Sequence, residues 1–238
     1  MSLIQPTRIT AEDFKAYSTA WKKLVNGPDA NSLHDYFTGD GGLINYVYLP
    51  AAMATELLAG RPTSIALEFA LIPGTATPTF SMMLAGLNSN NQPVVPYYQA
   101  GVAGRAKVVV QPTELMQPKS TDIPIPYEDA AAWINAWNAL LPDGLGPQQF
   151  ESGYNERLWA YDYSVSDLQD ALHSAAPANP ALWFNFMLHN ATPLFGTVLT
   201  LNSLPGDTDP GTIILRESLS YYDVSKPCPP FHLAEPAL

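Results

Sequence analysis

The sequence predicts an α+β fold built from two similar units in tandem, each with a helix, a strand, a second helix and then antiparallel strands. Three observations predict this fold. Blocks of sequence recur in the same order at nearly constant spacing, the first block of each copy has apolar residues at helical spacing, and short apolar runs alternate with Pro- and Asn-containing turns. The units either form two domains or share one pseudo-symmetric domain, and both arrangements stay open.

The recurrence begins with ITAEDFKAYSTAW, residues 9–21, which aligns with IPYEDAAAWINAW, residues 125–137. The alignment continues through three later blocks: 43–58 over 158–173, 66–72 over 181–187, and 76–84 over 191–199. Four blocks in one order are difficult to explain without tandem duplication. We therefore expect three segments in the chain: a first unit over 1–111, a proline-containing linker over 112–124, and a second unit over 125–238.

The first helix is expected over 10–26. Large apolar residues follow Tyr17 at the i+4 and i+7 positions, which places all three on one helical face. Thr10 stands three residues before Asp13, the spacing of an N-cap residue with an acidic partner. The helix should therefore begin close to Thr10.

Two acidic pairs recur in the aligned helices, Glu12-Asp13 and Glu128-Asp129. Paired carboxylates can perform acid–base chemistry. Acidic residues in a first helical turn also interact favourably with the helix macrodipole. The second interpretation is favoured, because all four residues fall in first turns.

The remaining elements follow from the same rules. Pro126 occupies a first-turn position, and Ser166 precedes the short second helix of its unit as a cap. The expected positions in chain order are a strand at 43–49, a helix at 50–59, strands at 64–72, 79–87 and 105–111, a helix at 126–141, a strand at 156–163, a helix at 166–174, and strands at 181–189, 194–202 and 211–220.

Four tyrosines alternate along the two aligned strands: Tyr46, Tyr48, Tyr161 and Tyr163. Side chains two residues apart in a strand face the same side of a sheet. We expect each pair to pack in the core or between the units, with a ligand-lining role as the alternative.

Composition excludes several classes of partner. The chain has 11 Lys and Arg residues, which are scattered, against 22 acidic residues, for a formal net charge of −11. Nucleic acids and anionic membranes require clustered cations, so neither is an expected partner. No apolar run reaches the length of a membrane-spanning helix, and the N-terminus lacks the pattern of a signal peptide. A single cysteine permits no intrachain disulfide, so a cytoplasmic location is expected.

No motif for nucleotide binding, serine hydrolysis or metalloprotease chemistry occurs, and no metal or cofactor is expected. The histidines are scattered, at positions 34, 173, 189 and 232. Cys228 lies four residues before His232. A zinc site needs three or four ligands, and these two residues alone are too few. Flanking prolines would hold the Cys228 thiol rigidly, so it is either a reactive thiol or an unreactive cysteine of the C-terminal segment.

The first unit carries an insertion over 90–107 that the second unit lacks. It contains Tyr97, Tyr98 and Arg105, where aromatic groups and positive charge gather. Loops on a rigid scaffold often bind ligands, so these three residues are the candidate binding residues. The alternative is a proline-rich surface excursion or an additional edge strand.

Three stretches carry a resemblance to a known group: IALEFAL (65–71), TFSMMLAGLNSNN (79–91) and YYDVSKPCPPF (221–231). They resemble a group of small uncharacterised bacterial proteins associated with Bacteroidetes, which end near a Pro-Cys-Pro-Pro motif. This chain departs from the group by carrying two copies, with the cysteine ending only on the second. The resemblance implies no activity.

Two functional hypotheses follow. The first is a non-catalytic binding or interaction protein in which the fused pair replaces a homodimer, with an unidentified protein or small molecule as partner. It predicts a monomer of 25.9 kDa with a pseudo-twofold arrangement. The alternative is a hydrolase or transferase with its site in the groove between the units. That enzyme would need a close cluster drawn from the histidines, Cys228 and the acidic residues.

Overall fold

The computed structural model confirms the α+β class. The residues that it describes are 4–39, 42–74, 77–111, 127–140, 144–151, 156–173, 177–189, 194–206, 211–216 and 226–228. The helices are α1 (Ala11–Val25), α2 (Ala51–Ala59), α3 (Tyr127–Asn138) and α4 (Val165–His173), with 3-10 helices η1 (Pro28–Phe37) and η3 (Pro147–Phe150). None of the helices in these ranges is long and apolar enough to cross a membrane.

The strands are β1 (Thr7–Ile9), β2 (Thr38–Gly39), β3 (Gly42–Leu43), β4 (Tyr46–Pro50), β5 (Ser64–Ile72), β6 (Thr79–Leu87), β7 (Pro93–Gln99), β8 (Lys107–Gln111), β9 (Ala160–Ser164), β10 (Pro180–Leu188), β11 (Phe195–Ser203), β12 (Thr212–Arg216) and β13 (Lys226–Cys228). Eight of the described strands lie close to their expected positions, whereas β1, β2, β3 and β13 were not expected. Within the insertion over 90–107, residues 93–99 form β7, which pairs antiparallel with β6. It is an additional strand but not the expected edge strand, because β1 pairs with its other side.

Two antiparallel sheets form the centre of the molecule. The larger has the strand order β1-β7-β6-β5-β9-β13, and the smaller has the order β11-β10-β4. The corresponding hairpins are β5–β6 in the larger sheet and β10–β11 in the smaller, and β7 continues the first hairpin by pairing with β6. The strand beside the first member of each hairpin comes from the other half of the chain, because β9 pairs with β5 and β4 pairs with β10. The halves therefore exchange strands.

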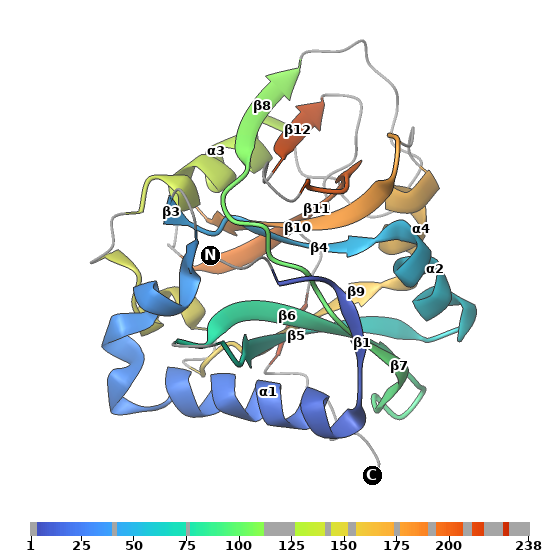
Figure 1. Cartoon of the computed structure of the whole chain (residues 1–238), viewed down its shortest axis with the longest axis horizontal. Coiled ribbons are helices and arrows are strands. Elements are labelled where there is room, and N and C mark those ends of the chain that lie inside the picture. Colours follow the sequence, from blue (N-terminus) through green and yellow to red (C-terminus); the bar gives the residue numbers. More distant parts are fainter. Residues whose placement is uncertain are drawn as a thin grey trace.

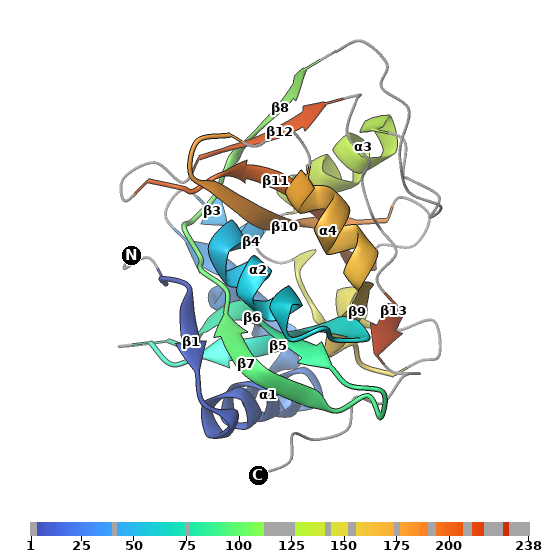
Figure 2. The ribbon, with the colours of Figure 1, turned by 90° about the vertical axis from the view of Figure 1, so that its right-hand side faces the viewer.

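The sheets stack as layers (Figure 1). Helix α1 lies beneath the six-stranded sheet, the three-stranded sheet lies above it, and α3 and the parallel pair β8–β12 lie at the top. Helices α2 and α4 lie side by side along one flank (Figure 2). The main apolar core fills the space between the two sheets and includes aromatic residues from both halves, among them Phe37, Phe80, Phe150, Phe186 and Phe195.

Two tryptophans join the halves reciprocally. Trp21 of α1 donates its indole N–H to the carbonyl of Leu158 at 3.1 Å, just before β9. Trp137 of α3 donates to the carbonyl of Ile44 at 2.9 Å, just before β4. Both tryptophans are fully buried. Each helix therefore holds the segment that leads into the strand contributed by the other half.

The helix caps test three predictions. Thr10 accepts the backbone N–H of Asp13, and the Asp13 carboxylate accepts the N–H of Thr10, so the predicted cap is confirmed. The cap of α4 is Ser164 rather than Ser166, because Ser164 Oγ accepts the N–H of Asp167. The Ser166 prediction was wrong by two residues, since β9 passes directly into α4. Pro126 lies outside the described residues.

The tyrosine pairs pack as expected but on different faces. The hydroxyls of Tyr161 and Tyr163 donate to carbonyl oxygens of β11 within the main core. Tyr46 and Tyr48 lie on the opposite face of the three-stranded sheet, beneath α3. The alignment of Tyr46 with Tyr161 is therefore out of register, because a one-residue shift in a strand reverses the direction of every side chain.

Candidate functional site

A charged group of side chains lies above a buried phenol where α2, β1 and β7 meet. Arg8 of β1 stands directly opposite Tyr98 of β7 in the antiparallel register. Its guanidinium lies 3.4 Å from the Glu56 carboxylate of α2, and both side chains are more than half exposed. Tyr98 is only 1% exposed. We call these three residues the α2–β1–β7 site.

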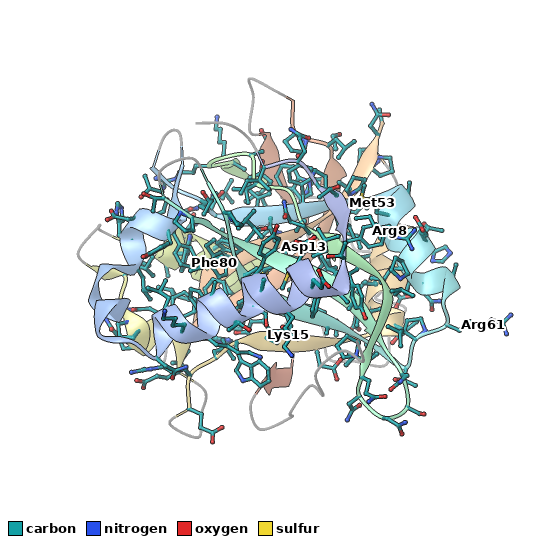
Figure 3. The ribbon with its side chains drawn as sticks, turned by 60° about the horizontal axis from the view of Figure 1, so that its bottom comes forward. Arg8, Asp13, Lys15, Met53, Arg61 and Phe80 are labelled. Carbon is teal, nitrogen blue, oxygen red and sulfur yellow. The ribbon has the colours of Figure 1, made fainter. Side chains whose placement is uncertain are left out.

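Local sequence explains how the strands place these groups. Successive strand residues face opposite sides, so Tyr97 points toward α1 and Tyr98 points into the space between the sheets. The pairing of β1 with β7 then carries Arg8 to the same side as Tyr98, and Figure 3 places Arg8 close to α2, beside Met53. The two charged groups therefore lie at the solvent end of a buried tyrosine.

The Tyr98 hydroxyl makes no hydrogen bond of standard geometry, although it is buried. Burial, followed by the hydrogen-bonding and charge interaction with the nearby Glu56 carboxylate, raises the pKa of Tyr98 to about 12, and Arg8 opposes the shift. The phenol stays protonated throughout the neutral range as a result. A buried O–H group normally has a hydrogen-bonding neighbour, and the Glu56 carboxylate is the charged acceptor near Tyr98.

The three groups together offer both hydrogen-bond donors and a hydrogen-bond acceptor. The guanidinium and the phenol donate hydrogen bonds, and the carboxylate accepts them. A phenol with a raised pKa is a poor general base near neutral pH. The α2–β1–β7 site therefore suits recognition of a group that carries both an acceptor and a cationic donor.

No protein-family model, curated protein or solved structure matches this chain. The assignment of a site consequently rests on the geometry of the described residues.

The structure separates the three candidate binding residues of the insertion. The ring of Tyr97 packs on Phe14 at 5.0 Å, and its hydroxyl donates to the Pro93 carbonyl at 3.2 Å. Arg105 donates to the carbonyl of Asn138, the last residue of α3, at 2.9 Å. A cation at this position also favours the negative end of a helix. Only Tyr98 of the three belongs to the α2–β1–β7 site.

Sequence reasoning did not identify Arg8 and Glu56. The two residues are 48 positions apart in the chain and belong to no common motif, so no spacing rule connects them. The one available signal was the insertion itself, which provided Tyr98.

The cysteine and histidines are distributed over several elements. Cys228 lies on β13 opposite Ala160 of β9, and His232 lies outside the described residues. His34 of η1 contacts the Thr38 hydroxyl, and His173 at the end of α4 contacts the Gln169 carbonyl. Within the described ranges, no three His, Cys, Asp or Glu residues are placed to hold a metal ion.

His189 follows β10 and packs its ring against Trp133 of α3, with 4.6 Å between ring centroids. Burial lowers the pKa of His189, so its protonated form is less favourable in the folded chain. The unfolded chain, with a histidine pKa of about 6.5, then binds the proton more readily. The stability contribution is complete above this pH and is lost as the pH falls below it.

The unfolding free energy of the wild type should therefore fall between neutral pH and pH 5, and we expect it to fall less in His189→Gln. Urea titrations at several pH values would measure the difference between wild type and variant. His173→Gln is the matched control, because this histidine is exposed at a helix end. An identical pH dependence in wild type and His189→Gln would contradict the prediction.

Proposed function

We propose that this chain is a non-catalytic binding protein built by internal duplication, and that the α2–β1–β7 site binds its partner. The partner would be a protein segment or small molecule whose bound group carries an acceptor beside a cationic amine. The acceptor would meet Arg8 and Tyr98, and the amine would meet Glu56.

Matched contacts in the two halves support the duplication. The rings of Phe37 and Phe80 lie 4.1 Å apart in the first half, and those of Phe150 and Phe195 lie 4.9 Å apart in the second. The reciprocal bonds of the two buried tryptophans add a second pair of equivalent contacts. Unrelated segments would not be expected to repeat side-chain pairs and strand exchange together.

The observation that carries the binding proposal is the position of Tyr98. The strand that bears it comes from an insertion with no counterpart in the second half. Its buried hydroxyl makes no hydrogen bond of standard geometry within the chain and interacts with the Glu56 carboxylate of the exposed ion pair above it. Exposed ion pairs contribute little to stability. A function in recognition would explain why the inserted strand β7 places Tyr98 beside Arg8 and Glu56.

Glycine is a suitable first probe, because it is a small zwitterion with both required charges. We expect millimolar glycine to shift the backbone amide NMR signals of residues 8, 56 and 98 in the full chain. Acetate and methylammonium, each with one of the two charges, should produce smaller shifts at the same concentration. Arg8→Gln and Tyr98→Phe should each weaken the glycine response severalfold.

Stability measurements separate recognition from structure. Tyr98→Phe removes a hydroxyl that interacts only with the carboxylate of Glu56, which is exposed enough to be hydrated instead, so the unfolding free energy should change by less than about 1 kcal/mol. Lys15→Gln, on α1, is the charge-matched control for Arg8→Gln and should leave the glycine response unchanged. Equal shifts with all three probes, or an unaltered response in both site variants, would refute the proposal.

The enzyme hypothesis gains no comparable support. Each described histidine lies on a different element and contacts different neighbours. No observation in the described part of the chain favours a hydrolase or transferase site, so we propose binding alone.

A further inference from the structure

The outer face of the three-stranded sheet carries a buried, uncharged polar group. Its members are Trp183 and Asn185 of β10 and Thr200 of β11, all of which are at most 3% exposed. Trp183 and Asn185 are two residues apart in one strand, so their side chains share a face. Thr200 stands directly opposite Trp183 in the register and therefore shares that face as well.

One hydrogen-bond donor and one hydrogen-bond acceptor on this face have no partner within the chain. The Trp183 indole N–H has no acceptor, and the Asn185 side-chain oxygen has no donor. The orientation of the Asn185 amide is fixed, because its nitrogen donates to the Val198 carbonyl and to Thr200 Oγ1, each at 2.9 Å. Rotating the amide would place two carbonyl oxygens against each other.

Thr200 supplies a third free hydrogen-bonding group. Its hydroxyl oxygen accepts from the Asn185 amide at 2.9 Å and from the Asn202 amide at 2.7 Å. These two bonds use both lone pairs and leave the hydroxyl proton to donate. The face therefore presents two donors, from Trp183 and Thr200, and one acceptor, from Asn185.

Two neighbours pack closely against the Trp183 ring. Tyr46 stacks on the Trp183 ring with 4.0 Å between centroids and an interplanar angle of 10°. The backbone of Gly211 approaches the same ring so closely that a Cβ there would lie 2.7 Å from Trp183 Cη2. The described residues of this group carry no charge, so an ion would not be compensated.

We infer that Trp183, Asn185 and Thr200 hold one buried water molecule on this face of the sheet. The water accepts from the Trp183 indole and the Thr200 hydroxyl and donates to the Asn185 oxygen. Three bonds are typical of a buried water, which satisfies polar groups that the chain leaves unmatched. This site is independent of the α2–β1–β7 site and of the proposed function.

Proton NMR of the intact chain tests the inference directly. A water molecule that stays bound for longer than the tumbling time of the protein produces a cross-relaxation peak between the water signal and the Trp183 indole proton. In rotating-frame spectra this peak has the opposite sign to a peak from chemical exchange, so the two can be distinguished. Trp21 and Trp137 are internal controls, since both indoles are fully buried and bonded to carbonyl oxygens. We expect the signal at Trp183 and none at the two controls.

A variant distinguishes the water from the nearby hydroxyl proton, which could relay magnetisation. Thr200→Val is nearly isosteric and removes that proton. The Trp183 signal should persist in Thr200→Val at reduced intensity if a water molecule is present. Loss of the signal in this variant, absence of the signal in wild type, or equal signals at all three tryptophans would each overturn the inference.

Discussion

Trp137→Ala should lower the unfolding free energy by about 3–5 kcal/mol, the usual cost of removing a large buried aromatic side chain. The indole contacts the rings of Phe37, Phe186 and Phe195 at 5.3 to 5.7 Å between centroids. It also bonds the carbonyl of Ile44, which loses its donor in the variant. The large cost follows from the loss of both packing and a buried hydrogen bond.

Chemical denaturation followed by far-UV and near-UV circular dichroism would measure this effect. Trp133→Ala is the matched control, because Trp133 lies one turn earlier on α3 and is only partly buried. The far-UV and near-UV signals should also show one common unfolding transition, because Trp137 of the second half contacts a segment of the first half. A cost no larger than that of Trp133→Ala, or separate transitions for the two signals, would show that Trp137 does not join the halves.

Asn45→Ala should cost about 3 kcal/mol, because a buried group that loses its hydrogen-bond partner carries a penalty of about 1–3 kcal/mol. The fully buried Asn45 amide donates to the Ala106 carbonyl at 2.9 Å and to the Asn138 side chain at 3.0 Å. Its oxygen accepts the Ala106 N–H at 2.9 Å. The substitution leaves both backbone groups of the buried Ala106 without their Asn45 partner.

Asn88→Ala provides the comparison for this second experiment. The Asn88 side chain also makes three hydrogen bonds, to Asn90 and Gln92, but in the turn that leads into β7. Water can replace these bonds, so the variant should cost less than Asn45→Ala in the same denaturant titration. Equal costs would mean that burial does not determine the contribution of Asn45.

Local pattern was sufficient to place most elements. The hairpin strands 64–72 and 79–87 coincide with β5 and β6, because an apolar run on each side of a short turn defines both strands. The α1 cap was predictable from two residues. These features depend on neighbours in the chain, which a sequence displays directly.

The strand exchange and the sites were not predictable in the same way. Alternation shows which residues share a face but does not identify the neighbouring strand, so nothing indicated that β9 would lie beside β5. Matching Tyr46 to Tyr161 by residue type gave the wrong face for the same reason. The α2–β1–β7 site combines residues 8, 56 and 98, and only the tertiary fold brings them together.

The strand exchange has a consequence for synthesis on the ribosome. Strand β4 is made early, but its partner β10 emerges only after most of the chain has been translated. During translation, the N-terminal half therefore has an unpaired strand and an exposed apolar surface until β10 is synthesised. Long-range pairing of this kind slows folding and exposes intermediates to aggregation. Chaperone dependence during translation, followed by a stable folded product, is the expected behaviour of this chain in a cell.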